Sequence, residues 1–300
     1  MVVRKYFRAW AAACGAVLIL SSTTARCGAE EPLNRENLVE PIYRVSKISP
    51  ADKQLDAIDQ HPLDPVLHMA GEIHANVRQN VRDYTCTLVK RENVGGTLLE
   101  HEFMHCKIRN EQVVDGRVVV PFSVYLKFLA PAAMKGREVI FVRGQNDDRL
   151  VAHEGGFKGR LIPTVNLVPD NMLAMRGNRY PITEIGLETL CRRLIEKGQR
   201  DRQLGDCIVE VRETAMVDDR PCTCVEVTHP TRQPQLDFHK ALVFMDKELK
   251  VPIRYEAYDW SSDGNGPGDL IEEYTYRKLK INVGLTDDDF NPDNPRYGFR

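Results

Sequence analysis

The chain has 300 residues, with 41 basic and 43 acidic side chains and a net charge of −2. A chain without an excess of basic residues is a poor match for nucleic acid, so the charge balance argues against a nucleic-acid-binding protein. The length suffices for one large domain or two small ones, and no linker, internal repeat or low-complexity tract divides the sequence.

The first 29 residues have the pattern of a signal peptide. Three basic residues within the first eight positions precede an uncharged run, residues 9–20, which is too short for a permanent transmembrane span. Cleavage is expected after Ala29 or after Ala25. An uncleaved anchor is an alternative, whereas a lipid-modified Cys27 is disfavoured by the bulky charge of Arg26. Removal of residues 1–29 leaves 37 basic and 43 acidic side chains, a net charge of −6, on a periplasmic or secreted protein.

Residues 30–63 are rich in Glu, Asn, Pro and Asp with scattered apolar residues, which predicts an extended or flexible arm. A helix is expected to begin at Asp64-Pro65, because Pro is favoured in the first turn and apolar residues follow at helical spacing from Val66 to Val81. Strands are expected from about Tyr84, with Gly95-Gly96 closing the first hairpin. Further strands are predicted to begin near these residues: Thr97, Val118, Arg137 and Arg149.

The segment from Thr183 to Lys197 interrupts the strand pattern. Leu187, Leu190, Cys191 and Leu194 recur at helical spacing, and Gly198 is expected to end the helix. Strands are predicted to resume near Cys207 and Pro221.

Residues 240–290 have the pattern of an antiparallel meander. Three runs of alternating apolar residues follow one another with short polar breaks, and the middle run spans Lys250 to Trp260. Beyond Tyr276 the apolar positions change parity, which predicts a one-residue bulge near Arg277-Lys278. A bulge bends a strand, so the sheet is expected to curve.

These elements together predict an α+β fold. A large curled antiparallel sheet, a half-barrel of about ten strands, is expected to wrap around one or two helices, because a sheet of that size must curl or close. We assign residues 64–292 to this single domain and residues 293–300 to a tail.

Six cysteines remain after removal of the signal peptide, in an oxidising compartment. Folding the first hairpin about Gly95-Gly96 sets Cys86 almost opposite Cys106, close enough for a disulfide. The alternative is that both are small core residues. The sequence leaves open the pairing of the others: Cys191, Cys207, Cys222 and Cys224.

The segment His101-Glu102-Phe103-Met104-His105 has the spacing of a zinc-protease motif, H-E-x-x-H. That motif requires a helix, on which the two histidines share a face one turn apart. Here the segment alternates as the return strand of a hairpin, where residues four apart are separated by about 13 Å. One zinc ion cannot bind both, since zinc ligands lie about 2 Å from the metal. We therefore expect no metal site, with a zinc protease as the least favoured alternative.

The C-terminal half resembles a known family. Three segments, Val251–Glu256, Glu272–Tyr276 and Leu279–Phe290, are similar to the end of periplasmic outer-membrane lipoprotein-carrier (Lol-type) domains. Upstream, Asp83–Cys86, Pro121–Leu129 and Asn178–Leu187 resemble a secreted bacterial family of unassigned function. The resemblance covers roughly residues 64–292, and it implies the same fold and a cavity for acyl chains.

A curled sheet presents a concave apolar face that is either filled by its own helices or open to a ligand. We expect a non-catalytic envelope protein that binds a lipid, a lipoprotein acyl chain or another apolar molecule, without a cofactor. The alternative is an envelope scaffold that binds protein and has a filled core. The irregular stretch from Asn166 to Ile182 is the candidate cover loop. The candidate lining residues are large and apolar: Phe122, Leu126, Phe128, Phe141, Met172, Met175, Leu190 and Leu194.

Overall fold

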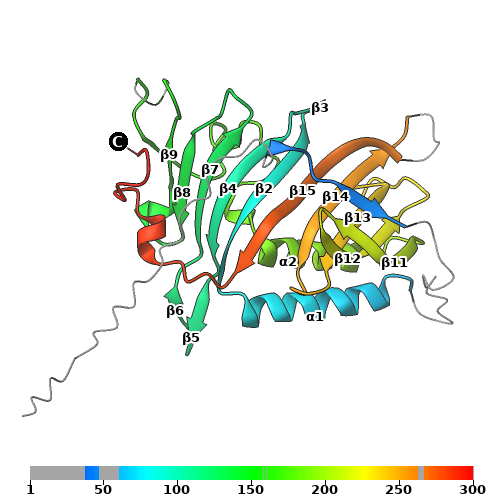
Figure 1. Ribbon diagram of the computed structural model, residues 1–300. Helices are drawn as coiled ribbons and strands as arrows, with labels where there is room; N and C mark the ends of the chain where they lie inside the picture. Colours follow the sequence, from blue (N-terminus) through cyan, green and yellow to red (C-terminus); the bar gives the residue numbers. More distant parts are fainter. Residues whose placement is uncertain (1–37, 47–60, 158, 160, 263–266, 300) are drawn as a thin grey trace, which may run out of the picture. The chain divides into compact units, whose positions relative to one another are not determined.

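A computed structural model describes residues 38–46, 61–157, 159, 161–262 and 267–299 (Figure 1). Contacts group the chain into two units, Met1–Leu33 and Asn34–Arg300, and every described residue belongs to the second. The predicted signal peptide, residues 1–29, lies outside the described residues. In the described part, no helix combines the length and apolar character needed to cross a membrane.

An open, curled antiparallel sheet of thirteen strands dominates the described residues. Neighbouring strands follow the order β1-β11-β12-β13-β14-β15-β2-β4-β7-β8-β9-β10, and β3 pairs with β2. The strands of this sheet are β1 (Tyr43–Val45), β2 (Asp83–Val94), β3 (Thr97–Leu98), β4 (Glu102–Arg109), β7 (Ser123–Ala130), β8 (Glu138–Val142), β9 (Leu150–His153), β10 (Val165–Leu167), β11 (Ile208–Val217), β12 (Arg220–Thr228), β13 (Lys240–Asp246), β14 (Pro252–Trp260) and β15 (Pro267–Ile281). The predicted α+β fold with a curled sheet is confirmed.

The predicted meander and its bulge are also confirmed. Strands β13, β14 and β15 pair in sequence order, and β15 then pairs with β2. The register of β15 against β2 shifts between Arg277 and Lys280, and Lys278 has a φ of 51°. The change of apolar parity in the sequence therefore marks a real irregularity in the strand.

Two α-helices cover one face of the sheet, α1 (Asp64–Asn80) and α2 (Leu187–Asp201). Helix α1 begins where Asp64-Pro65 predicted. Helix α2 begins later than the expected Thr183, because Ile182–Glu184 forms a separate 3₁₀ turn. It also continues past Gly198, so the prediction that this glycine ends the helix was wrong.

Gly198 instead lies where the two helices touch. A Cβ atom built at this position would lie 2.8 Å from Leu67 Cδ2 of α1, closer than carbon atoms approach in folded proteins. Glycine is therefore tolerated inside this helix because it permits close packing, which offsets its cost of roughly 1 kcal/mol relative to alanine.

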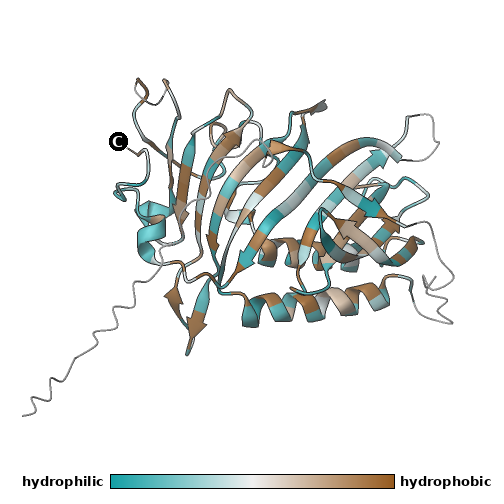
Figure 2. Cartoon of the chain, viewed as in Figure 1, coloured by the Kyte–Doolittle hydropathy of each residue, from teal (hydrophilic) through white to brown (hydrophobic). Residues whose placement is uncertain are grey.

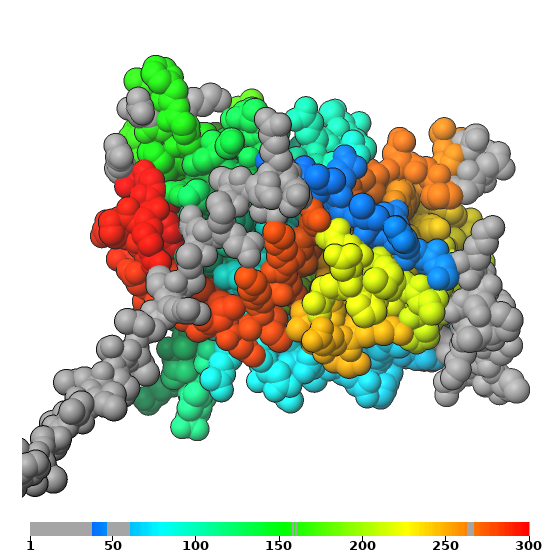
Figure 3. All heavy atoms as spheres, viewed as in Figure 1, coloured from blue at the N-terminus to red at the C-terminus, as the bar shows by residue number. Residues whose placement is uncertain are grey.

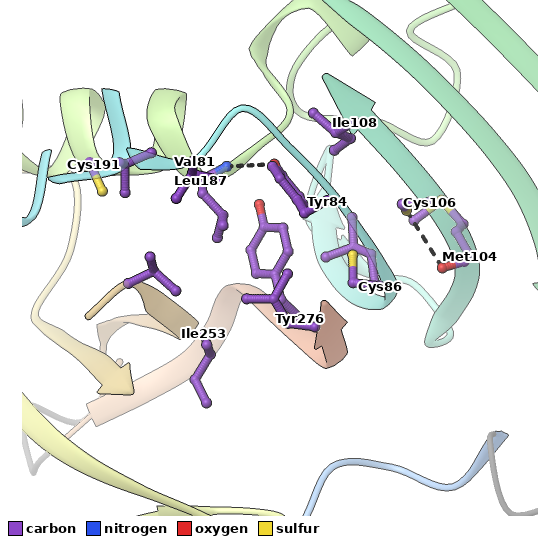
Figure 4. Packing of buried hydrophobic residues seen from close by; sticks show 14 of the residues in the cluster. Val81, Tyr84, Cys86, Met104, Cys106, Ile108, Leu187, Cys191, Ile253 and Tyr276 are labelled. Carbon is purple, nitrogen blue, oxygen red and sulfur yellow. Dashed lines mark hydrogen bonds between the residues drawn. The ribbon is translucent and has the colours of Figure 1, made fainter. Parts of the chain in front are cut away.

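The start of α2 is attached to the sheet by a hydrogen bond (Figure 4). The backbone N–H of Leu187 donates to the hydroxyl of Tyr84 on β2, at 2.9 Å. The preceding residue, Gly186, has a φ of 117°, and a Cβ there would lie 2.9 Å from the same hydroxyl. A glycine is thus needed at this turn, both for its backbone conformation and for its size.

Residues 38–46, which include β1, partly cover the face of β13, β14 and β15 that is turned away from the helices (Figure 3). The ring of Tyr43 packs edge-on against Phe244, with centroids 5.4 Å apart, and lies 4.4 Å from the guanidinium of Arg254. Strand β1 pairs with β11. Part of the predicted arm thus joins the sheet.

The C-terminal segment packs on the opposite half of the sheet. Tyr297 stacks on Tyr125 of β7 with ring centroids 4.2 Å apart, and Lys107 Nζ lies 3.0 Å from Asp289 Oδ1 in the 3₁₀ turn Asp287–Phe290. The predicted tail therefore contacts the sheet from residue 297.

A separate hairpin, β5 (Gln112–Val114) and β6 (Arg117–Val120), extends from the main sheet and is largely apolar (Figure 2). Four of its valines are more than half exposed: Val113, Val114, Val118 and Val119.

Candidate functional site

A cavity of about 460 Å³ lies between the curled sheet and α2. Its walls come from β2, β4, β7, β8, β9, β14, β15, α2 and the segment around β10. This volume is within the range of about 300–1,000 Å³ that is usual for small-molecule sites. Apolar side chains of the sheet form its floor: Leu88, Met104, Leu126, Phe128, Val139 and Leu150.

Strand alternation explains the apolar floor of the cavity. It also explains why the cavity surface changes from apolar to charged along β2. Residues two apart on a strand share a face, so Leu88, Lys90 and Glu92 all face the cavity. The apolar surface therefore becomes charged toward the end of β2. Lys90 is buried, and its Nζ lies 3.3 Å from Glu92 Oε2 and 3.1 Å from Glu102 Oε2.

A third carboxylate, Glu272 of β15, completes this polar end. It is 2% exposed and accepts hydrogen bonds from Arg179 Nε at 2.9 Å and from the Tyr180 hydroxyl at 3.3 Å. Burial, and then the negative charge of Glu272, raise the pKa of Tyr180 to about 12. Burial also raises the pKa of Tyr274, which donates to Glu92. Both tyrosines therefore stay protonated at neutral pH and act as donors.

The structure places four of the eight predicted lining residues at the cavity and the other four elsewhere. Leu126, Phe128, Leu190 and Leu194 line the cavity. Phe122 and Phe141 are buried in the main hydrophobic core, with their rings 6.4 Å apart. Met172 is 90% exposed, and Met175 is half-buried outside the lining.

Sequence reasoning missed the charged and tyrosine residues of the cavity. A signal for them was present in β2, where Lys90 and Glu92 interrupt the face that carries Cys86 and Leu88. The partners on β15 and in the segment after β10 had no such signal, because only the fold brings them to the same place.

A second, smaller cavity of about 100 Å³ lies between α1, α2 and the strands β12, β13 and β14. Leu194, Lys197 and Tyr255 line both cavities. Helix α2 therefore contributes to the two cavities at once, whereas α1 contributes only to the smaller one.

The H-E-x-x-H segment lies on a strand, as predicted, with four of its five residues in β4. His101 Nε2 is 2.7 Å from Glu273 Oε1, and His101 Nδ1 is 3.2 Å from Glu40 Oε1. Among the described residues, no cluster of three or more His, Cys, Asp or Glu side chains has an arrangement suited to a metal ion.

The predicted register of the first hairpin is confirmed, because Cys86 and Cys106 are direct partners across β2 and β4. Both thiols are buried and free, and Cys106 Sγ donates to the carbonyl of Met104 at 3.5 Å (Figure 4). The hydrogen bond with Cys106, and then burial, raise the pKa of the Cys86 thiol. The disulfide between them stays a prediction.

A curled antiparallel sheet with two helices on one face and a cavity between the sheet and α2 defines the class of this domain. Residues 81–299 match the model of a family described as protein of unknown function (DUF1571), and the chain belongs to this family. No curated protein matches the sequence.

Several solved structures match this chain at low sequence identity. A DUF1329 family protein from Desulfovibrio piger is 15% identical, with 77% of this chain and 98% of that chain covered and a TM-score of 0.34. A putative outer membrane lipoprotein-sorting protein domain from Vibrio parahaemolyticus is 15% identical, with 75% and 95% covered and a TM-score of 0.35. The Pseudomonas aeruginosa MucA/MucB complex contains a chain that is 16% identical, with 76% and 60% covered and a TM-score of 0.40.

Proposed function

We propose that the protein is a non-catalytic component of the cell envelope that binds a lipid or another apolar molecule between the sheet and α2. The observation that carries this proposal is the cavity of about 460 Å³ with its apolar floor. A largely apolar hollow of this size between a sheet and its helix is typical of a site that a small molecule fills. The predicted signal peptide would deliver the protein to the periplasm or outside the cell.

The alternative, a protein-binding scaffold with a filled core, is less well supported by this cavity. A zinc protease is disfavoured by the strand conformation of the H-E-x-x-H segment and by the two carboxylates beside His101.

The proposal is tested by extraction of lipids from protein purified out of its native envelope, followed by mass spectrometry. A second arm measures uptake of the neutral fluorescent probe N-phenyl-1-naphthylamine. Ala152 lines the cavity from β9, so Ala152→Trp should fill part of it and reduce uptake. Val151 is its neighbour on the opposite face of β9, and Val151→Trp is the matched control.

The expected result is a co-purified lipid, probe uptake by the wild type and the Val151→Trp variant, and reduced uptake by the Ala152→Trp variant. Protein without lipid that also takes up no probe would contradict the proposal and favour the scaffold.

A further inference from the structure

The ionic side chains around the larger cavity are almost fully paired with one another. Five basic and four acidic side chains line it: Lys90, Arg137, Arg176, Arg193, Lys197, Glu92, Glu154, Glu184 and Glu272. Lys90 pairs with Glu92, as described above. Arg137 Nη2 lies 2.9 Å from Glu154 Oε1, and Arg193 Nε lies 3.0 Å from Glu184 Oε2.

The fourth basic residue, Lys197, also has acidic partners. Its Nζ lies 3.4 Å from Asp237 Oδ2 and 3.9 Å from Glu272 Oε1. Glu272 additionally binds Arg179, at 2.9 Å. Each of the four lining carboxylates thus has a cation within ion-pair distance.

Of the five basic side chains that line the cavity in the described part of the chain, Arg176 alone has no acidic partner. It lines the cavity and is exposed, yet no acidic side chain of the described chain lies within ion-pair distance of it. It follows Leu173 and Ala174, which line the cavity too. Leu173 is 61% exposed and Ile162, another lining residue, is 43% exposed. These residues form the mouth of the cavity, where one unpaired cation lies beside apolar side chains in contact with water.

We propose that the ligand is an amphiphile with an anionic headgroup, a carboxylate or a phosphate, which binds Arg176 while its apolar chain lies on the floor formed by Leu88, Met104 and Leu126. This inference rests on the function proposed above. A guanidinium binds either anion through two parallel hydrogen bonds. At the mouth the headgroup keeps contact with water, so the charge is not fully desolvated.

The polar end at Lys90 and Glu92 is a poorer place for the headgroup. Its charges are buried and already bound to each other, so an added anion would have to displace Glu92 or Glu102 from Lys90. Breaking a buried ion pair is costly, because it leaves one charge without compensation. This cluster instead fixes Asn178, whose Oδ1 accepts from Lys90 Nζ at 2.6 Å, and so holds the segment that carries Arg176.

The test is competition for the cavity, with N-phenyl-1-naphthylamine as the reporter. Dodecanoate, 1-dodecanol and dodecyltrimethylammonium, below their micellar concentrations at pH 8, share a chain length and differ in headgroup charge. We expect dodecanoate to bind at least about 10-fold more tightly than 1-dodecanol, which corresponds to about 1.4 kcal/mol. Arg176→Gln should remove most of this difference and leave the affinity for 1-dodecanol unchanged, whereas Arg176→Lys should retain much of it.

The matched control is Arg82→Gln, which removes an exposed arginine that is remote from the cavity lining and should change neither affinity. Dioctanoyl phosphatidylglycerol and dioctanoyl phosphatidylcholine distinguish the sources of the anion. Preference for phosphatidylglycerol would assign a phospholipid, and preference for dodecanoate over both would assign a free fatty acid.

Equal affinities for the three dodecyl compounds, tighter binding of dodecyltrimethylammonium, or an unchanged preference in Arg176→Gln would each overturn this inference and leave the proposed function standing. A wild-type protein that takes up neither the reporter nor any competitor would overturn the proposed function itself.

Discussion

Replacement of Arg254 by alanine should strongly destabilise the protein. Arg254 lies on β14, is 3% exposed and is the central cation of a buried ionic cluster. Its Nη2 lies 2.5 Å from Glu256 Oε2 and 2.6 Å from Glu273 Oε2, and its Nη1 donates to Thr275 Oγ1 at 2.6 Å. The variant would leave two carboxylates buried without their shared cation.

The expected loss follows from the cost of uncompensated buried charge. Removal of one partner from a buried ion pair lowers the free energy of unfolding by about 3–5 kcal/mol. For a domain of this size, each kcal/mol changes the melting temperature by about 2–4 °C, which gives a decrease of about 6–20 °C. The variant also loses the contact between the Arg254 guanidinium and the ring of Tyr43.

The loss should depend on pH, because the two carboxylates respond to Arg254. Burial raises the pKa of Glu256. Burial opposes ionisation of Glu273 as well, but the hydrogen bond from His101 and the charge of Arg254 lower its pKa below the ordinary value. A lowered folded-state pKa adds stability above the unfolded-state pKa, and this stability is lost as the pH falls through the folded-state value. Without Arg254 this contribution shrinks, and protonation relieves the repulsion between the two carboxylates.

The deficit of the Arg254→Ala variant should therefore be larger at pH 8 than at pH 5. Urea unfolding at both pH values measures it, with Arg82→Ala as the control that should stay within about 0.5 kcal/mol of the wild type. A deficit below about 1 kcal/mol, or one of equal size at both pH values, would refute the reasoning.

Three further predictions concern the cavity, the cysteines and the histidines. Leu190→Arg places a charge in the cavity and should abolish uptake of N-phenyl-1-naphthylamine while circular dichroism stays unchanged; uptake equal to that of the wild type would contradict it. Cys86 and Cys106 should form a disulfide in protein exported to an oxidising compartment, closing a loop of about 20 residues that contributes about 3 kcal/mol. Non-reducing peptide maps that find both thiols free would disprove it. Purified protein should contain no stoichiometric zinc, and zinc that is lost on His101→Ala or His105→Ala would count against this expectation.

The fold was predictable where local signals agree with the tertiary structure. The meander from β13 to β15 has the alternation of apolar and polar residues that predicts strands, although both faces of β14 are buried from Pro252 to Ala257. Its bulge at Arg277-Lys278 is also visible in the sequence as a change of apolar parity. The ends of α2 were less predictable. Its start depends on the hydroxyl of Tyr84, about 100 residues away in sequence, and its passage through Gly198 depends on Leu67.

The site was only partly predictable, because lining and core residues have the same composition. Phe122 and Phe128 have the same parity in one apolar run and both belong to the main core, yet only Phe128 also lines the cavity. The difference depends on which segment covers each residue, and one sequence does not contain that information. Met172 illustrates the reverse case, since an apolar residue in the expected cover loop lies in solvent.

The contact between Gly198 and Leu67 has a consequence for how ligand size can evolve. Helix α2 stands between the smaller cavity and the larger one, and at Gly198 it packs against the end of the Leu67 side chain of α1. A larger residue at this position would require either the Leu67 side chain or α2 to shift, and a shift of α2 would change the space in the larger cavity. The capacity of the cavity can therefore change through substitutions behind the helix, in relatives whose lining residues are all identical.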